Sequence, residues 1–522
     1  MNPMILCINL GTTGCRTSIF NELGEQLSQS YQEYQSIYLS PGWIEHDPAT
    51  WLEAVRKTVK EAVSSLKIDT KKLYAISVTS QRSTFIPVDK QGNHLDNAIL
   101  WQDKRAIEEA KFLINTYTLE EIYNITGLRI DPYFTLPKLL WLKRNKEEVY
   151  KKAFKFLPVQ DFIICFLTGL FKTDWTQASR TLLFNIDQFK WEENLINDVG
   201  IDFDKLPEVV PPGAIIGRLN HSAAVMLGLP EGIPVIAAGG DQQCSAIGLG
   251  IVREGLLEVN TGTGSFILTH CNQPFKDINL RLICSASSIA GKWVLEAGIF
   301  TTGSIYRWFR DEIYYFPKDN QKEIKTDVYS FMNLEAEKEQ VGANGLLLIP
   351  HFAASAAPYW NPEARGILFG LTLNHKCSSI IRAILEGIAL EIRKNIMIIE
   401  KYIGDVKEVR VSGGLTRAEV FNQIQADVYG KTVIKTIYED TSSLGAAIIA
   451  AAKLGLYNNL VTAGDFMTKL DYSSQKKPIN MHSKIYQDLA EIHDQLYQVI
   501  DGSGFYHKIN QIRKDYMKNS SN

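Results

Sequence analysis

The chain has 522 residues, of which 45% are hydrophobic and 22% are charged, and its formal net charge is −3. These values argue against a disordered chain and against a broad basic surface for nucleic acid. The length exceeds that of one ordinary hydrophobic core, so we expect two to four folded units in a globular protein.

Neither the start of the chain nor its cysteines point to secretion. No basic segment is followed by a long apolar stretch at the start, and the longest apolar stretches, 162–171 and 444–452, are too short for a membrane helix. The seven cysteines form no Cys-x-x-Cys pair, which favours reduced thiols over a zinc site or a disulfide framework. We expect a cytoplasmic protein without membrane or nucleic-acid partners.

The first predicted elements are two strands around a turn rich in glycine and threonine. Residues 5–8 form an apolar run that leads into the segment 9–14, Asn-Leu-Gly-Thr-Thr-Gly. Glycines in such a turn let backbone N–H groups converge on an anion, and threonine hydroxyls add donors. One such turn by itself is equally well explained as a β-hairpin turn that needs glycine for positive φ.

A helix is predicted over about residues 48–66. Asp47 stands at its N-cap position and Pro48 at its first helical position. Apolar residues recur every four positions along one face, at Trp51, Val55, Val59 and Val63. The next segment, 73–80, is rich in β-forming residues and is predicted to be a buried strand that ends at Gln81.

The second half repeats this order of elements. A second turn, 260–264 (Asn-Thr-Gly-Thr-Gly), follows the apolar segment 256–259. A long apolar helix is predicted from about 378 to 402, and a strand at 409–412 ends in two glycines. The repeat indicates a duplication, and two spaced copies of the turn favour phosphate binding over two plain hairpin turns.

These patterns predict an α/β protein with three regions. We place a first domain at 1–250, a second at 251–456 and a polar, partly helical extension at 457–522. Ligands of open α/β sheets bind beyond the carboxyl ends of the strands, so residues 81–82 and 413–414 lie where ligands are expected. Two such domains facing each other would form a cleft.

Several longer motifs occur in order along nearly the whole chain. The segment 133–145 contains Lys138 and, three residues later, Trp141. The segment 366–386 begins with Gly-Ile-Leu-Phe-Gly-Leu. Shorter motifs lie at 101–105, 178–184, 308–311 and 358–366. Together they resemble the FGGY family of carbohydrate kinases, which includes glycerol kinase and xylulokinase. The two longer segments are similar to the two family signatures, with Ser379 where the second expects an acidic, amide or His residue.

The resemblance implies a duplicated actin-like ATPase fold made of two RNase H-like domains. It also implies phosphoryl transfer from ATP, with Mg²⁺, to a hydroxyl of a small sugar or polyol. This chemistry requires in-line positioning, neutralised phosphate oxygens and a group that orients or deprotonates the attacking hydroxyl. The oligomeric state is left open between a homodimer and a homotetramer.

Asp241 is the candidate catalytic base. It follows the strand-like segment 233–238 and two glycines, and it opens a helix-like segment. From spacing alone, Asp241 is equally well explained as an N-cap. The resemblance to the family's Gly-Asp-Gln-Gln segment favours the base, and it also implies contacts of Asp241 with the acceptor and with the metal.

The resemblance implies two further sets of contacts. The predicted nucleotide contacts are Gly11, Thr12, Thr13, Gly262, Thr263, Gly264, Gly303, Gly413 and Gly414. The predicted acceptor contacts are Gln81, Arg82, Ser83, Trp101, Tyr133, Asp241 and Gln242. Arg and Gln bind hydroxyls through paired hydrogen bonds, and aromatic planes pack on carbon-bound hydrogens. Packing explains the two aromatic residues equally well, and turn structure is a fair alternative for Gly303, Gly413 and Gly414.

The chain departs from the family pattern at two positions. Ser83 stands where glycerol kinases carry a Glu that accepts two adjacent hydroxyls, so its presence argues against glycerol as the acceptor. Asn9 stands where the family carries an Asp that helps to hold Mg²⁺. Asn keeps a carbonyl oxygen but lacks the charge that Mg²⁺ prefers, so we expect weaker metal retention.

The sequence thus predicts an ATP-dependent kinase that acts on a terminal hydroxyl of a small polyol or ketose such as xylulose or ribulose. Glycerol and an autoinducer-2-type molecule are the alternative acceptors. A weakly active nucleotide-binding sensor is a further alternative because of Asn9. An actin-like filament or chaperone ATPase is disfavoured by the motifs on the sugar side.

Overall fold

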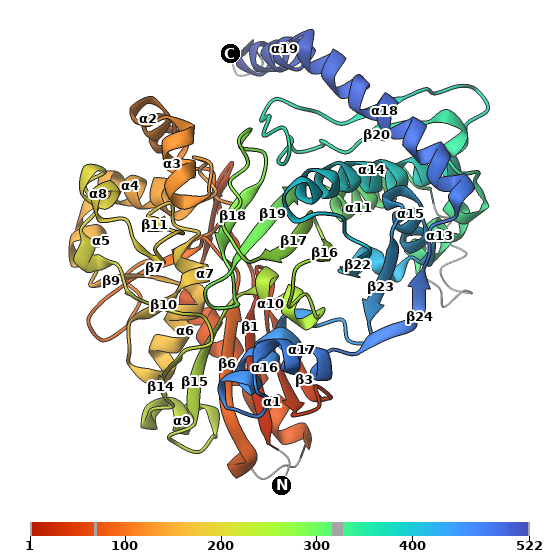
Figure 1. Ribbon diagram of the computed structural model, residues 1–522. Helices are drawn as coiled ribbons and strands as arrows, with labels where there is room; N and C mark the ends of the chain where they lie inside the picture. Colours follow the sequence, from red (N-terminus) through yellow and green to blue (C-terminus); the bar gives the residue numbers. More distant parts are fainter. Residues whose placement is uncertain (1–2, 67–69, 316–326, 520–522) are drawn as a thin grey trace. The chain divides into compact units, whose positions relative to one another are not determined.

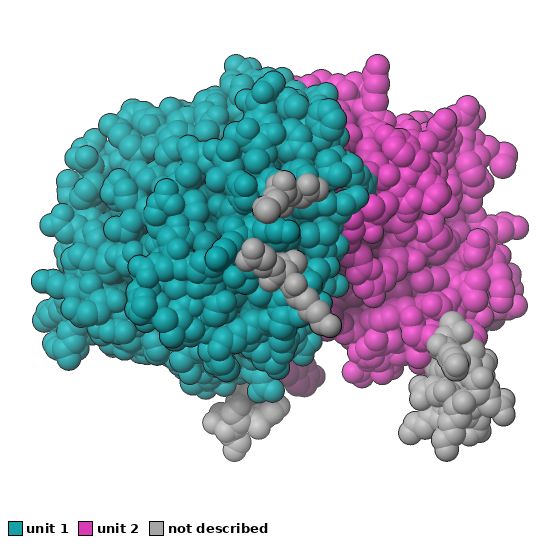
Figure 2. Space-filling model, turned by 90° about the horizontal axis from the view of Figure 1, so that it is seen from below, with its two compact units in different colours: residues 1–254, 270–295, 440–469 teal, residues 255–269, 296–439, 470–522 magenta. Residues whose placement is uncertain are grey.

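The computed structural model describes residues 3–66, 70–315 and 327–519. The chain forms two compact units, each assembled from three separate segments (Figure 2). Unit 1 comprises Met1–Glu254, His270–Leu295 and Asp440–Lys469. Unit 2 comprises Gly255–Thr269, Glu296–Glu439 and Leu470–Asn522.

Unit 1 is built around a six-stranded sheet (Figure 1). Its strands follow the order β14 (Ile215–Arg218), β15 (Pro234–Gly240), β6 (Leu73–Ser80), β1 (Met4–Leu10), β2 (Gly14–Asn21) and β3 (Gln26–Glu33). The central strands β15, β6 and β1 are parallel, whereas β2 and β3 continue antiparallel from β1. Nearly every side chain of β1 and β6 is buried, as expected for the parallel centre of a sheet covered on both faces.

Helix α1 (Pro48–Leu66) confirms the predicted helix in both position and orientation. The Asp47 Oδ1 atom accepts a hydrogen bond from the Ala49 N–H at 2.9 Å, which satisfies one donor of the first turn. The predicted apolar face packs into the core of unit 1, where Trp51, Val55 and Val59 are fully buried and Val63 is partly buried. Strand β6 likewise covers the predicted residues 73–80.

The other helices of unit 1 surround this sheet and a smaller one. The smaller sheet follows the order β4 (Ile37–Ser40), β5 (Trp43–His46), β8 (Ala98–Ile99), β7 (Phe85–Val88) and β9 (Lys155–Pro158). The helices are α2 (Ile107–Thr116), α3 (Leu119–Thr126), α4 (Thr135–Asn145), α5 (Glu147–Lys152), α6 (Val159–Thr168), α7 (Trp175–Ala178), α8 (Glu193–Asp198), α9 (His221–Leu227), α10 (Asp241–Gly248), α16 (Thr441–Lys453) and α17 (Leu460–Met467). Short strands are β10 (Lys172–Asp174), β11 (Phe184–Asn185), β12 (Lys190–Trp191), β13 (Glu208–Val210) and β18 (Ile283–Ala286).

Unit 2 repeats the strand order of unit 1. Its sheet has seven strands, in the order β18, β19 (Trp293–Ile299), β17 (Ser265–Cys271), β16 (Leu256–Thr261), β22 (Glu408–Ser412), β23 (Thr432–Thr436) and β24 (Leu470–Lys476), and the six from β19 to β24 correspond to the strands of unit 1. Strand β16 is antiparallel to β17 and parallel to β22, just as β1 is antiparallel to β2 and parallel to β6. The register is also equivalent, because Asn260 lies opposite Ser412 as Asn9 lies opposite Thr79. The predicted duplication is therefore present in the topology.

The helices of unit 2 include the long apolar helix predicted from the sequence. That helix, α14 (Cys377–Ile403), extends one residue beyond each predicted end. The others are α11 (Gly303–Glu312), α13 (Val328–Lys338), α15 (Glu419–Tyr429), α18 (Asn480–Gly502) and α19 (Phe505–Asn519). Strands β20 (Leu347–Ile349) and β21 (Ile367–Phe369) form an antiparallel pair. Across the described residues, we find no helix with the length and apolar character needed to cross a bilayer.

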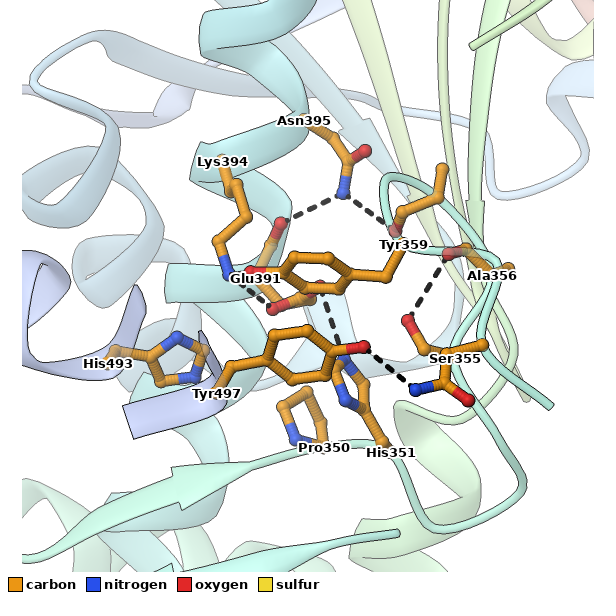
Figure 3. Close-up of polar contacts among 12 residues, drawn as sticks. Pro350, His351, Ser355, Ala356, Tyr359, Glu391, Lys394, Asn395, His493 and Tyr497 are labelled. Atoms are coloured by element: carbon orange, nitrogen blue, oxygen red, sulfur yellow. Dashed lines mark hydrogen bonds and ion pairs between the residues drawn. The ribbon is translucent and has the colours of Figure 1, made fainter. Parts of the chain in front are cut away.

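The loop between β20 and β21 is attached to α14 and α18 by a buried polar network (Figure 3). The Glu391 carboxylate accepts hydrogen bonds from His351 Nε2 at 3.3 Å and from Lys394 Nζ at 3.2 Å. The rings of Tyr359 and Tyr497 stack with centroids 3.6 Å apart. Burial by itself raises the pKa of Glu391, but the nearby positive charge of Lys394 and the contact with His351 hold it well below its usual value. The network anchors the motif at 358–366 through Tyr359, whose hydroxyl accepts a hydrogen bond from Lys394 Nζ at 2.6 Å.

Candidate active site

The segment that follows β6 places three predicted acceptor contacts in the interior of unit 1. Gln81, Arg82 and Ser83 are each at most 4% exposed. Ser83 has φ = 63°, in the left-handed region, so the chain turns sharply at this residue. The Arg82 side chain lies against Gly240, where an added Cβ would be only 2.4 Å from Arg82 Cδ. Glycine at 240 therefore lets the guanidinium side chain pass directly in front of the strand end that carries Asp241.

Gln81 connects this segment to the first glycine turn. Its backbone N–H donates to Leu10 O at 2.8 Å, and its side-chain Nε2 donates to Gly11 O at 3.3 Å. Its Oε1 accepts a hydrogen bond from Thr84 Oγ1 at 3.2 Å. The amide of Gln81 is thus fixed between the turn and the acceptor segment, and its orientation follows from these partners.

Trp101 and Tyr133 form an aromatic corner beside the same segment. Their rings meet edge to face with centroids 5.3 Å apart. Trp101 Nε1 donates to Thr12 Oγ1 at 3.0 Å, and the Trp101 backbone N–H donates to Thr84 Oγ1 at 3.0 Å. Both rings are half-buried, so each keeps an accessible surface on which an acceptor can pack.

Asp241 is the first residue of α10, immediately after β15. The N-cap position is held by Gly240, which forms no side-chain cap, so Asp241 does not occupy the capping position that spacing alone allows. Its Oδ1 atom accepts a hydrogen bond from the Gln242 N–H at 2.8 Å. The Gln242 Oε1 atom is buried without a hydrogen-bond partner among the described residues, so it can accept from a bound hydroxyl.

The first glycine turn joins β1 to β2 as a hairpin. The Gly11 N–H donates to Gly14 O at 3.0 Å, which closes the turn around Thr12 and Thr13. Thr13 is exposed, and its Oγ1 lies 3.4 Å from Tyr31 Oη. The turn is thus both a hairpin turn and a surface with available threonine hydroxyls.

The second glycine turn joins β16 to β17 and is held against the start of α11. The Gly262 N–H donates to Gly264 O at 2.9 Å, and Gly303 N–H donates back to Gly262 O at 3.1 Å. An added Cβ at Gly303 would lie 2.4 Å from Gly262 O, and one at Gly413 would lie 2.5 Å from Thr261 O. Close backbone approach therefore accounts for glycine at both positions. Gly414 faces open space, with no atom within 4 Å of an added Cβ.

The first strand ends with a polar atom that fits a metal or water ligand. Asn9 Oδ1 is buried and has no hydrogen-bond partner among the described residues. Within the described part of the chain there is no cluster of three or more His, Cys, Asp or Glu side chains that could hold a metal by themselves. This combination fits Mg²⁺, which is usually held by one or two protein oxygens together with substrate phosphates and water. Asn9 and Asp241 are the residues that would hold it.

Two residues with direct contacts to this site were not among the predicted contacts. Lys138 on α4 donates from Nζ to Ser83 O at 2.7 Å. Arg180, which is buried, places its guanidinium carbon 5.4 Å from the centre of the Tyr133 ring. Both residues lie in motifs that carry the family resemblance, at 133–145 and 178–184. Those motifs indicated the family but did not predict a role for either residue.

Fold and site together define the class of protein. Two sheets share one strand order, and each carries a glycine and threonine turn after its first central strand. In unit 1, the buried Arg82 lies against the strand end that precedes an aspartate, and an aromatic corner is hydrogen-bonded to the first glycine turn through Trp101 and Thr12. These features define a kinase of the actin-like ATPase fold.

Two long segments of the chain match the two domains of one protein family. Residues 4–248 match the N-terminal domain of the FGGY family of carbohydrate kinases, and residues 257–454 match its C-terminal domain. The chain belongs to this family, and it is an ATP-dependent phosphotransferase with an alcohol group as acceptor.

Relatives and solved structures agree with this assignment. The chain is 34% identical over 466 residues to a glycerol kinase of Thermococcus onnurineus, which covers 88% of this chain and 91% of that protein. It is 32% identical over 496 residues to a glycerol kinase of Leptospira biflexa, covering 91% and 96%. Plasmodium falciparum glycerol kinase with ADP matches with a TM-score of 0.83 and 26% identity, covering 95% and 98%. A gluconate kinase from Lactobacillus acidophilus has a TM-score of 0.89 at 24% identity, covering 98% and 100%, which supports the fold alone.

Proposed function

We propose that this kinase transfers the γ-phosphoryl group of ATP to a terminal hydroxyl of a small polyol or ketose, with Asp241 as general base. The proposal rests on one arrangement in unit 1: Arg82 lies against Gly240, directly before Asp241, while Gln81 and Trp101 are hydrogen-bonded to the first glycine turn. Hydroxyls can be held by the amide and guanidinium groups, while the carbon chain packs on the rings.

In the proposed reaction, the acceptor hydroxyl oxygen forms a bond to the γ-phosphorus of ATP. The bond from that phosphorus to the β–γ bridging oxygen breaks, its electron pair stays on ADP, and the hydroxyl proton passes to the Asp241 carboxylate. The proposed nucleotide contacts are Gly11, Thr12, Thr13, Gly262, Thr263, Gly264, Gly303, Gly413 and Gly414.

We propose Mg²⁺ as the metal, held by Asn9 and Asp241 together with the phosphates of ATP. When bound, it would neutralise charge on the transferring phosphoryl group. Asn9 offers a neutral oxygen instead of a carboxylate, so we expect the enzyme to need more Mg²⁺ than an enzyme with Asp at this position. A weakly active nucleotide-binding sensor is the rival proposal.

The acceptor is proposed to be larger than glycerol. Ser83 is a short, neutral residue at the turn after β6, and it leaves space and no carboxylate for a pair of adjacent hydroxyls. Glycerol is the second candidate because the glycerol kinases of Thermococcus onnurineus and Leptospira biflexa match most of the chain.

We further propose that the chain is organised as three regions, 1–250, 251–456 and 457–522. We also propose a cytoplasmic location and a homodimeric or homotetrameric state.

A substrate panel tests the proposal. ADP release should be measured with glycerol, erythritol, xylulose, ribulose, gluconate and autoinducer-2 precursor, each at several Mg²⁺ concentrations. Acceptor-dependent ADP release with a ketose or a longer polyol supports the proposal. Release with glycerol alone selects the second candidate, whereas ADP release without any acceptor, or none at all, contradicts both.

A further inference from the structure

Lys138 is a fully buried cation whose three partners are backbone carbonyls. Its Nζ donates to Ser83 O at 2.7 Å, to Tyr133 O at 3.0 Å and to Leu100 O at 3.1 Å. A lysine ammonium has three N–H donors and no acceptor, so these bonds use its whole donor capacity. Helix α4 therefore directs a saturated cation at three separate loops.

The three carbonyls belong to the segments that carry the predicted acceptor contacts. Ser83 and Tyr133 are themselves in that set, and Leu100 immediately precedes Trp101. Ser83 and Leu100 flank the paired strands β7 and β8, whose register places Phe85 opposite Ile99, whereas Tyr133 lies in the segment before α4, outside that sheet. No regular backbone ladder can therefore hold all three together, and the ammonium supplies the common partner instead.

We propose that Lys138 is a positioning residue that fixes the three backbone segments of the acceptor site relative to one another, so that Trp101, Tyr133 and Ser83 meet the acceptor in one geometry. This inference rests on the proposed function, because it takes these residues as acceptor contacts. Lys138 itself donates inward to the backbone, so its effect on the acceptor is transmitted through the loops.

The charged groups near the Lys138 ammonium lie on two of the three loops, the one that contains Leu100 and the one that contains Tyr133. Asp103, Lys104 and Arg105 follow Trp101, and Asp131 precedes Tyr133. Arg105 is already paired with Asp103 at 2.9 Å and with Glu45 at 2.7 Å.

Burial is the main cause that lowers the pKa of Lys138, to about 7, and the attraction of Asp103 only partly opposes it. A neutral amine has two N–H donors and a lone pair, so above this pH one of the three carbonyls loses its bond.

The proposal predicts that loss of the Lys138 ammonium changes the KM for the acceptor much more than the KM for ATP. Lys138→Met keeps an unbranched side chain close to the volume of the lysine stem but removes every donor. We expect the KM for the acceptor to rise at least tenfold while the KM for ATP changes by less than about twofold. The probes are xylulose and glycerol. Lys143→Met is the matched control, because Lys143 lies on the same helix but donates to Gly200 O, and both constants should stay unchanged. Equal changes in the two constants, or none, would overturn the proposal.

The pH profile of the wild type provides a test that needs no variant. The KM for the acceptor should be constant below pH 7 and rise above it, while the KM for ATP stays level. Lys138→Arg keeps a charge at all pH values, so its acceptor KM should lose this rise. An acceptor KM that is level in the wild type between pH 6 and 9 would contradict the proposal.

Amide hydrogen exchange separates this inference from the proposed function. In the protein without substrates, Lys138→Met should speed exchange at residues 81–85, 100–104 and 131–135 but not in β2 and β3. Unchanged exchange in those loops overturns the positioning role even if the enzyme is active. If neither probe is phosphorylated but the loops exchange faster, the proposed function fails while the structural role of Lys138 stands.

Discussion

The indole N–H of Trp101 donates to the Thr12 hydroxyl at 3.0 Å, which joins a predicted acceptor contact to a predicted phosphate contact. Because Thr12 Oγ1 accepts this bond, its own O–H is free to point toward a phosphate oxygen. The same tryptophan packs edge to face on Tyr133. One side chain therefore connects the two sets of contacts within unit 1.

Trp101→Phe keeps an aromatic ring beside Tyr133 but removes the indole N–H that donates to Thr12. The loss of one hydrogen bond costs about 1 kcal/mol, so we expect kcat/KM to fall about fivefold, with effects on both acceptor and ATP. Steady-state kinetics with each substrate varied in turn measures this. Trp293→Phe is the control, because its indole N–H donates to Ile186 O away from the predicted contacts. If only the KM for the acceptor changed, the Trp101–Thr12 hydrogen bond would have no effect on ATP binding.

Asp241→Asn should lower kcat by about 10²–10⁴-fold, the range typical of a general base. The amide keeps the shape of the side chain but cannot take the hydroxyl proton. The KM for the acceptor should change much less than kcat. Asp465→Asn removes a carboxylate from an exposed ion pair with Arg253 and should leave turnover unchanged. Ordinary turnover by the Asp241 variant would remove it from the role of base.

Ser83→Glu should shift preference toward glycerol. A carboxylate at this position can accept two adjacent hydroxyls and fills the space that a longer acceptor needs. We expect the ratio of kcat/KM for glycerol to that for xylulose to rise about tenfold or more. Ser83→Gln has the same length without the charge and separates the two effects. If both variants leave the ratio unchanged, Ser83 does not select the acceptor.

Asn9→Asp should lower the Mg²⁺ concentration needed for half-maximal turnover. The carboxylate adds the negative charge that Mg²⁺ prefers, whereas Asn9→Ala removes the oxygen and should raise the requirement. Titrating Mg²⁺ against turnover at fixed ATP measures both shifts. Identical metal dependence in wild type and Asn9→Asp would refute a metal role for this position.

Glu391→Gln should destabilise unit 2 by about 2 kcal/mol, because Lys394 would lose one of its two carboxylate partners and keep only Asp494, at 2.8 Å. The pKa of Glu391 is lower in the folded than in the unfolded chain, where its ordinary value is 4.5. Its contribution is therefore complete above that pH and is lost as the pH falls below it. Urea unfolding between pH 7 and 3 should show a shallower acid loss in the variant. Glu337→Gln, at an exposed position, should keep the wild-type slope.

Local patterns determined much of the fold. The bounds of α1 and β6 follow from the Asp47 cap, the four-residue apolar spacing and a run of β-forming residues, all of which act within one element. The duplication was also predictable, because each copy repeats a strand, a glycine turn and a second strand in the same order. The motifs then predicted the FGGY family, and the two family domains confirm it.

The sequence by itself determined the elements, their repeat and the class of chemistry, because these depend on local spacing and on residue types. Tertiary structure alone decided that Gly240, rather than Asp241, caps α10 and that Arg82 passes over Gly240. It also decided that Lys138 joins its own preceding loop, at Tyr133, to Leu100 and Ser83, which lie 38 and 55 residues from it in the sequence. The contact of Arg82 and two of the three contacts of Lys138 form between residues that are far apart in the sequence, and no local sequence pattern indicates which of those residues meet.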